Sequence, residues 1–114
     1  MTLRETTIAA LRRRVTLEAP VEAPDDAGGV ARSWTPVARP WAAVSAMPAA
    51  EAGERHVADR PEIAVRRRLV LRWRPGVDGR LRLRDGERLY RILAAADPDG
   101  RRRRLVLTVE EVMP

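Results

Sequence analysis

The residues with the clearest potential for chemistry lie in one polar segment, Pro48–Pro61, which holds the only histidine of the chain. Carboxylates near this histidine have the types that acid–base catalysis and metal binding use. A lone histidine without a second ligand does not make a metal site, and no apolar residues nearby would enclose a carboxylate and shift its pKa. We therefore predict no catalytic residue, no metal site and no cofactor. The residues considered are His56, Glu51, Glu54 and Asp59.

Other residue types that serve catalysis give no further site. Ser33 and Ser45 have no nucleophile motif around them, and Gly28-Gly29 is not followed by the GK[ST] of a phosphate-binding loop. The chain has no cysteine, which excludes disulfides and thiolate metal sites. These observations argue against a small hydrolase and favour a structural or binding protein.

Arginine is the dominant charged residue. The 22 basic residues are all arginine and face 16 acidic residues, giving a net charge of +6. The absence of Lys, Phe and Asn suggests GC-rich coding, so part of this excess reflects codon usage. Side chains alternate faces along a strand, so the runs 66–68 and 101–104 cannot present every charge to one ligand. They suit solvated strand ends, salt bridges between subunits, or a basic patch near DNA. The arginines expected at such an interface, or near DNA, are Arg66, Arg68, Arg72, Arg101, Arg102, Arg103 and Arg104.

The second half of the chain predicts four short strands joined by strong turn sequences. The strands are expected at Ala64–Trp73, Arg80–Arg84, Arg88–Ala95 and Arg101–Val112. Asp85-Gly86 and Asp97-Pro98-Asp99-Gly100 are typical turns, the second of type I. In the last strand we expect Leu105, Leu107 and Val109 to point inward, with Val106, Thr108 and Glu110 on the other face.

The first half predicts three further strands with a chain reversal between the first two. Arg14–Ala19 alternates, Pro20–Asp26 is expected to be a loop, and the glycine-rich sequence that follows reverses the chain. Val30–Thr35 and Val37–Ala46 are the next strands. Their prolines lack an amide donor, which places Pro36 and Pro40 at a sheet edge or bulge.

These elements predict an all-β fold, a small antiparallel barrel or sandwich of six to seven strands. Residues 14–114 are expected to form one barrel domain with the long loop 48–61 inserted, after an N-terminal arm at 1–13 in which Leu3–Leu11 has helical spacing. The N-terminal region has no apolar run suited to a signal peptide or membrane span, which favours a cytosolic protein without membrane contact. The expected core residues are Trp34, Trp41, Trp73, Tyr90, Leu69, Leu71, Ile92, Leu105 and Leu107.

The order of these features resembles the phage head–tail joining proteins, also called head completion, head closure or stopper proteins. The resemblance covers residues 11–111 and begins with LRRRVTL at 11–17, DAGGV at 26–30, Trp34 and WAAV at 41–44. It continues with RWRPGV at 72–77, where the family more often has tyrosine in place of Trp73, and with RLYRI at 88–92 and DPDGR at 97–101. The N-terminal extension departs from many relatives.

This resemblance implies a small β-barrel that assembles as a homo-oligomeric ring, six-fold or alternatively twelve-fold. The ring would lie below the portal and adaptor, above a tail terminator or tail tube, and around packaged double-stranded DNA contacted without sequence specificity. Such a protein belongs to the virion, or to a gene transfer agent particle, and is assembled in the bacterial cytoplasm. The alternative from composition is a monomeric basic β-barrel that binds nucleic acid, although aromatics at 4% disfavour a base-stacking surface.

In the family, a long loop between early and late strands can point into the lumen as a gate. Here that segment is Pro48–Pro61, and it lacks bulky plugging side chains. Its acidic residues would repel DNA phosphate and its arginines would attract it. The candidate gating residues are Glu51, Glu54, Arg55, His56, Asp59 and Arg60.

Overall fold

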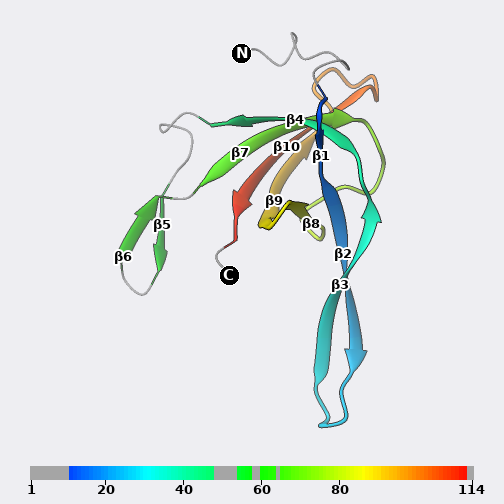
Figure 1. The fold of residues 1–114 in the computed structure, drawn as a ribbon, viewed down its shortest axis with the longest axis vertical. Coiled ribbons are helices and arrows are strands. Elements are labelled where there is room, and N and C mark those ends of the chain that lie inside the picture. The colour runs from blue at the N-terminus through cyan, green and yellow to red at the C-terminus, as the bar shows by residue number, and fades with distance from the viewer. Residues whose placement is uncertain (1–10, 48–53, 58–59, 64, 113–114) are drawn as a thin grey trace.

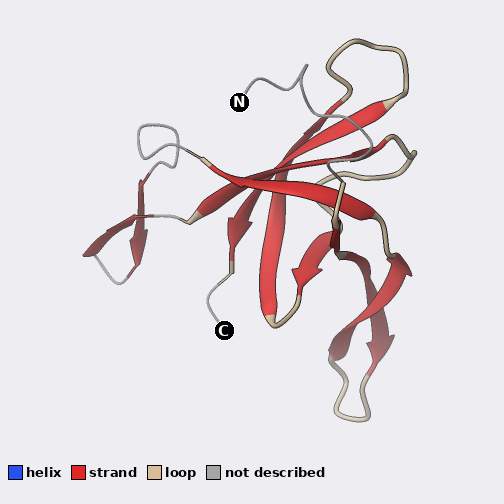
Figure 2. Cartoon of the chain, turned by 45° about the horizontal axis from the view of Figure 1, so that its top comes forward, coloured by secondary structure: helices blue, strands red, loops and turns tan. Residues whose placement is uncertain are grey.

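The computed structural model describes residues 11–47, 54–57, 60–63 and 65–112, and every regular element among them is a β-strand (Figures 1 and 2). The strands are β1 (Arg13–Arg14), β2 (Thr16–Pro24), β3 (Val30–Ala38), β4 (Trp41–Ala46), β5 (Glu54–Val57), β6 (Arg60–Ile63), β7 (Arg66–Arg72), β8 (Arg82–Asp85), β9 (Arg88–Ala96) and β10 (Arg104–Glu111).

Eight of these strands form one antiparallel sheet in the order β1-β4-β7-β10-β9-β8-β2-β3. The segment that runs from β1 into β2 pairs with strands from both ends of this order. Arg13 and Arg14 pair with β4, and Thr16–Glu18 pair with β8. Because neighbouring residues of one segment join both ends of the sheet, the sheet curls into a small barrel (Figure 2). The predicted all-β antiparallel fold is confirmed, with more strands than the six to seven expected.

The barrel interior is filled by aliphatic side chains at alternating strand positions, together with the ring of Tyr90. Trp73, Val77 and Leu81 are partly buried and pack against this core. Burial of these side chains is the main stabilising contribution for so small a fold. The buried cluster comprises Val15, Leu17, Ala42, Leu69, Leu71, Leu83, Tyr90, Ile92, Leu105, Leu107 and Val109.

Strand β10 is buried on both faces, which differs from the one-sided stripe expected. Leu105, Leu107 and Val109 point into the core, but Val106 is only 9% exposed and Glu110 only 1% exposed. The physical reason is the position of β10, which lies between β7 and β9 in the middle of the sheet. Side chains of both neighbouring strands cover its outer face, as Arg66 of β7 and Arg91 of β9 do at Glu110.

The segment expected as a loop, Pro20–Asp26, instead extends strand β2 and pairs with β3 down to Pro24 opposite Val30. The resulting ribbon projects from the barrel and gives the molecule its long dimension, 52 Å against 34 and 25 Å (Figure 1). At its end the Asp25 carboxylate accepts hydrogen bonds from the backbone N–H groups of Ala27 (2.9 Å) and Gly29 (2.7 Å). Gly28 has φ 84°, the left-handed conformation that glycine adopts without strain. The predicted reversal therefore lies at the end of a long hairpin.

The strand expected at Val37–Ala46 is divided between two elements. Its first two residues complete β3, and β4 begins only at Trp41, after Pro40. The pairing of β2 with β3 shifts register so that Glu18 lies opposite Pro36 and Leu17 opposite Ala38, which leaves Val37 unpaired in a bulge. β3 is the edge strand of the sheet, so both the edge and the bulge match the absence of an amide donor at proline.

The long segment 48–61, expected to be an irregular loop with a helical turn, contains part of a second sheet. β5 and β6 pair as a hairpin, with His56 opposite Pro61 and Val57 opposite Arg60. Residues 48–53 and 58–59 lie outside the described part of the chain. Residues 1–10 of the predicted N-terminal arm also lie outside it. The last three residues of the predicted arm are described. Leu11 and Arg12 are not in a helix, and Arg13 belongs to β1.

Candidate interaction surfaces

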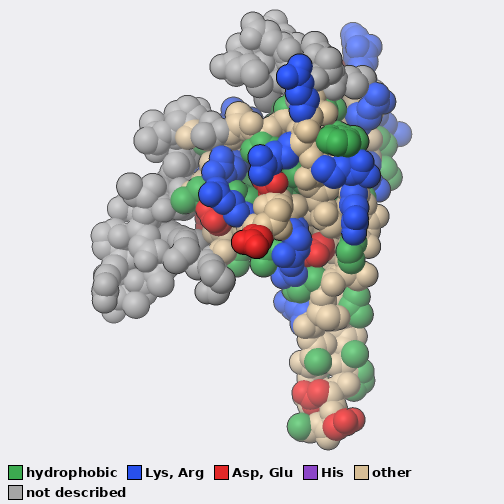
Figure 3. All heavy atoms as spheres, in the orientation of Figure 1, with side chains coloured by type: hydrophobic (Ala, Val, Ile, Leu, Met, Phe, Trp, Pro, Cys, Tyr) green, Lys and Arg blue, Asp and Glu red, His purple; other side chains and the backbone are tan. Residues whose placement is uncertain are grey.

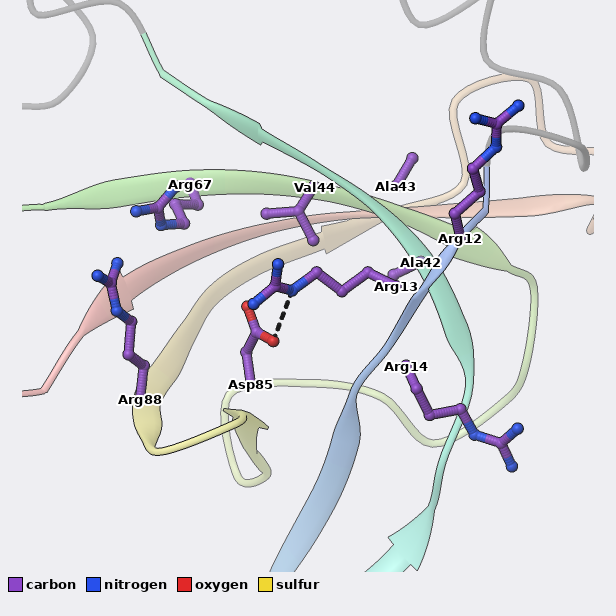
Figure 4. Close-up of a pocket in the computed structure, with 9 residues that line it drawn as sticks. All are labelled: Arg12, Arg13, Arg14, Ala42, Ala43, Val44, Arg67, Asp85 and Arg88. Atoms are coloured by element: carbon purple, nitrogen blue, oxygen red, sulfur yellow. Dashed lines mark hydrogen bonds and ion pairs between the residues drawn. The ribbon is translucent and has the colours of Figure 1, made fainter.

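A basic groove of about 900 Å³ lies where the barrel closes, between β1, β4 and β7 on one side and the β8–β9 turn on the other (Figure 4). Its floor is formed by Ala42, Ala43 and Val44 of β4. Its charged lining contains five arginines and a single carboxylate, so the groove has a strong excess of positive charge. The charged residues of this basic groove are Arg12, Arg13, Arg14, Arg67, Asp85 and Arg88.

Two of these arginines are held by groups of the barrel. Arg13 reaches across the groove and donates from Nε to Asp85 Oδ1 at 2.8 Å (Figure 4). This hydrogen bond and the charge of Asp85 raise the pKa of the Arg13 guanidinium above its usual value. Arg67 donates from Nε to the hydroxyl of the buried Tyr90 at 2.9 Å. Asp85 offsets one of the five arginine charges by pairing with Arg13, so the groove lining keeps an excess of four positive charges.

Two carboxylates are buried in the barrel wall, and each is held by two arginines. Glu18 on β2 accepts from Arg82 (2.6 Å) and Arg84 (3.4 Å) of β8. Burial by itself raises the pKa of Glu18, but the hydrogen bonds and charges of Arg82 and Arg84 outweigh it, so the pKa lies below its usual value. The sequence predicted a strand at Arg14–Ala19 but no partner for Glu18. The sequence signal for its burial was the recurrence of arginine at alternate positions, Arg82 and Arg84, of the neighbouring strand β8.

Glu110 on β10 repeats this arrangement. It accepts from Arg66 Nε of β7 at 3.1 Å and from Arg91 Nη2 of β9 at 2.8 Å. Burial raises the pKa of Glu110, and the hydrogen bonds and charges of the two arginines lower it further than burial raises it. Three adjacent strands are therefore linked through one carboxylate. Arg66, one of the arginines predicted for an interface or for DNA contact, forms this ion pair within the subunit.

The arginines predicted for an interface are divided between two places. Arg66 and Arg68 begin β7, whereas Arg72 ends it, about 20 Å from Arg66 at about 3.3 Å per residue. Arg72 lies opposite Arg104, so it joins the arginines of the β9–β10 turn. In that turn Arg101, Arg102 and Arg103 are exposed, and Arg102 has φ 56° with its backbone N–H donating to Asp97 Oδ2 at 2.9 Å. The seven residues do not form one patch.

Each tryptophan carries an arginine on its ring. Arg14 lies 5.0 Å from the Trp41 ring centroid, Arg82 lies 4.3 Å from that of Trp34, and Arg102 lies 5.3 Å from that of Trp73. Trp41 was expected in the core, but it is 51% exposed. Trp34 is half-buried at the base of the hairpin and outside the core cluster. The other predicted core residues lie in that cluster or pack against it.

A smaller cavity of about 380 Å³ lies beside the exposed Trp41, where β4 begins. Two tryptophans, Pro40 and Leu11 give it an apolar lining with Arg72 and Arg74 at its sides. Exposed aromatic surface next to arginine is typical of contacts between proteins.

This difference in burial gives a first prediction. Trp73→Ala removes a ring packed against the core and is expected to lower the free energy of unfolding by about 3 kcal/mol. Trp41→Ala removes a ring that is 51% exposed and is expected to cost under about 1 kcal/mol. Urea unfolding followed by circular dichroism measures both. Equal losses would mean that Trp41 supports the fold as much as Trp73 does.

The candidate gating residues lie in or next to the β5–β6 hairpin. Glu54, Arg55 and His56 belong to β5, and Arg60 belongs to β6. Glu51 and Asp59 lie outside the described residues. The pairing aligns the backbone of Arg55 with that of Glu62. Hairpin pairing thus brings four of the six predicted residues into one element.

Across the described ranges, no three or more His, Cys, Asp and Glu side chains are grouped as metal ligands. The same part of the chain contains no helix of the length and apolarity needed to cross a membrane.

Comparison with known proteins identifies relatives with this fold. Residues 7–112 match the family described as phage head completion protein. A chain from the virion of a native gene transfer agent particle shares 28% sequence identity and a TM-score of 0.64, covering 91% of this chain and 97% of that one. Protein SF1141 from Shigella flexneri 2a, solved in solution, shares 24% identity and a TM-score of 0.68 over 93% and 96% of the two chains, a likeness of fold. The comparison with curated protein sequences gave no match.

The family match spans all the strands described above, from before β1 to beyond the end of β10. The chain therefore belongs to the phage head completion protein family, whose members are structural components of phage and phage-like particles.

Proposed function

We propose that this protein forms a homo-oligomeric ring in the head–tail connector, below the portal and adaptor. In this role the ring closes the DNA channel after packaging and docks the tail terminator or tail tube. The single observation that carries the proposal is the family match over residues 7–112. It is supported by the relative from a gene transfer agent virion, of which the alignment covers 97%.

The surfaces of the barrel suit a protein that works by assembly. The projecting hairpin, the basic groove and the exposed Trp41 all lie outside the closed core, so they are available for contacts with other subunits. No bond is made or broken in this role. The energy comes from burying apolar surface and pairing charges between neighbouring subunits.

The test is to prepare particles that lack this protein. We expect heads without tails, and packaged DNA that becomes accessible to nuclease because the channel is open. Negative-stain microscopy counts the tailed particles, and quantitative PCR after DNase treatment measures the protected DNA. Tailed particles with fully protected DNA would exclude a role in the connector.

A sharper prediction concerns the segment proposed as the gate. Deleting residues 51–59 removes β5 but none of the eight strands of the barrel, so the protein should fold and join particles. Those particles are expected to lose DNase protection of their DNA while keeping the protein. Glu87→Ala, at an exposed position outside this segment, serves as the control and should retain both assembly and protection. Unchanged protection after the deletion would show that this segment is not the gate.

The basic groove also favours a second candidate function, a monomeric nucleic-acid-binding protein. That function predicts tight binding of free DNA with a logarithmic salt slope of about −0.7 to −0.9 per neutralised phosphate. A connector subunit predicts weak binding to free DNA and ring formation on its partner. Titration of labelled duplex DNA at several salt concentrations separates the two.

A further inference from the structure

The hairpin of β2 and β3 continues beyond the barrel without support from other strands. The last residue of β2 that pairs with β8 is Glu18, so residues 19–35 form an arm whose only strand pairing is internal. Val21 and Val30 on this arm are 43% and 65% exposed. A two-stranded ribbon is marginally stable alone in water. The arm therefore has an apolar surface suited to a partner.

The root of the arm is firmly attached, whereas its tip is not. Arg82 of β8 pairs with Glu18 at 2.6 Å and lies on the ring of Trp34, and so holds both strands of the arm. From Glu18 to Pro24 the ribbon reaches about 20 Å beyond the barrel at about 3.3 Å per residue. This reach approaches the narrow dimensions of the molecule, 34 and 25 Å, so the tip can extend onto an adjacent copy.

Charge is segregated between the tip and the rest of the chain. Residues 21–30 contain Glu22, Asp25 and Asp26 and no arginine, but Arg32 of the facing strand pairs with Glu22, so Asp25 and Asp26 are the tip carboxylates that face no arginine within the described residues. The remaining residues carry 22 arginines and 13 acids, a net charge of +9. Figure 3 shows the acidic tip at the far end of the arm, away from the blue arginines of the barrel. Asp26 makes no hydrogen bond or ion pair within the described residues.

The basic groove has complementary chemistry. Arg88 lines the β9 side of the groove, and its one carboxylate, Asp85, pairs with Arg13, whereas Arg14 points away from them and lies on the ring of Trp41 (Figure 4). Its volume of about 900 Å³ is at the upper end of the range for pockets that enclose a ligand, about 300–1,000 Å³. A tight turn of a polypeptide fits such a volume. The apolar floor of β4 suits a protein segment better than a phosphate backbone.

We propose that the acidic tip of the arm of one copy binds the basic groove of the next copy. The arm points away from its own barrel, so the contact joins different surfaces of two copies (Figure 1). Such a head-to-tail contact repeats around a closed ring when the rotation closes. This inference rests on the proposed ring and names the contact that holds its subunits together.

Cysteine cross-linking tests the contact directly, because the natural chain has no cysteine. Ala27→Cys at the tip and Val44→Cys in the groove are combined in one chain, and assembled particles are treated with a short bismaleimide. We expect a ladder of covalent dimers, trimers and larger species. A control chain pairs Ala27→Cys with Ala95→Cys, an exposed position on β9 outside the groove, and should stay monomeric. A ladder that stops at dimers, or the same ladder from both chains, would overturn the proposal.

A charge exchange tests its chemistry. Asp26→Arg and Arg88→Glu should each lower the fraction of tailed particles at least tenfold, since like charges then meet at the contact. Combining both changes in one chain should restore at least half of that fraction. The control is Arg39→Glu, which makes the same charge change as Arg88→Glu at an exposed position outside the groove lining, and should have little effect. If Arg88→Glu particles keep their tails but lose DNA, the groove binds DNA and the proposal is wrong. In that case the connector function still stands.

Discussion

Replacing Glu110 by alanine is expected to lower the free energy of unfolding by about 3 kcal/mol. The carboxylate is 1% exposed and accepts from Arg66 and Arg91, so its loss removes the acceptor that links β7, β10 and β9. The side chains of these arginines are 29% and 62% exposed, and water replaces part of the lost interaction. Urea denaturation at neutral pH measures the change. A loss under about 1 kcal/mol would mean that this ion pair behaves as a surface pair.

The same carboxylates give the protein a defined sensitivity to acid. The folded-state pKa of Glu18 and of Glu110 lies below the usual value of 4.5. A carboxyl group whose pKa is depressed on folding stabilises the protein above its unfolded pKa and loses that contribution as pH falls through the folded pKa. Stability should therefore decline as pH drops below about 4.5. Glu110→Gln should reduce this decline, whereas Glu87→Gln, at an exposed position, should leave it unchanged.

Strands with one buried face could be predicted from the sequence, because apolar residues alternate along them. Strand segments without a buried face could not be predicted in this way. The alternation of Leu69 and Leu71, or of Leu105 and Leu107, placed β7 and β10 correctly because each pair faces the core. The outer part of β2 has no buried face, so its sequence carries no alternation and Pro20 suggested a loop. Its pairing with β3 depends on the turn built by Asp25, whose geometry appears only in the folded chain.

Closure of the barrel was also beyond local patterns. It depends on the segment Arg13–Glu18, in which Arg13 and Arg14 pair with β4 and Thr16–Glu18 pair with β8. These pairings join residues that are far apart in the sequence. The sequence predicted Pro40 at an edge or bulge inside one strand, but Pro40 separates β3 from β4. In the structure the Pro40 carbonyl accepts from the Val15 N–H at 3.1 Å, between β1 and β2. Non-local pairing of this kind follows from topology and not from propensity.

The candidate surfaces were predicted by residue type but not by arrangement. Arginine abundance indicated charge pairing, yet the arginines that line the groove include Arg14 and Arg88, which the runs at 66–68 and 101–104 did not suggest. Tryptophan was assigned to the core on hydrophobicity alone, although an arginine-covered ring such as Trp41 can remain at the surface. Burial of Glu110 requires knowing that β7 and β9 flank β10.

Leu107→Ala is expected to cost about 3–4 kcal/mol, because Leu107 is fully buried in the middle of β10 between Leu69 of β7 and Ala95 of β9. A small protein has about 5–15 kcal/mol of stability in total, so this single cavity removes a large share. Leu93→Ala is the matched control, since Leu93 is 40% exposed on β9 and its truncation should change stability by about 0.5 kcal/mol or less. Thermal and urea denaturation of the purified variants measure both, and equal losses would contradict a core centred on β10.

The comparison also separates folding from assembly. Leu107→Ala should lose particles together with stability, whereas the groove variant Arg88→Glu should lose tailed particles while unfolding as the natural protein does.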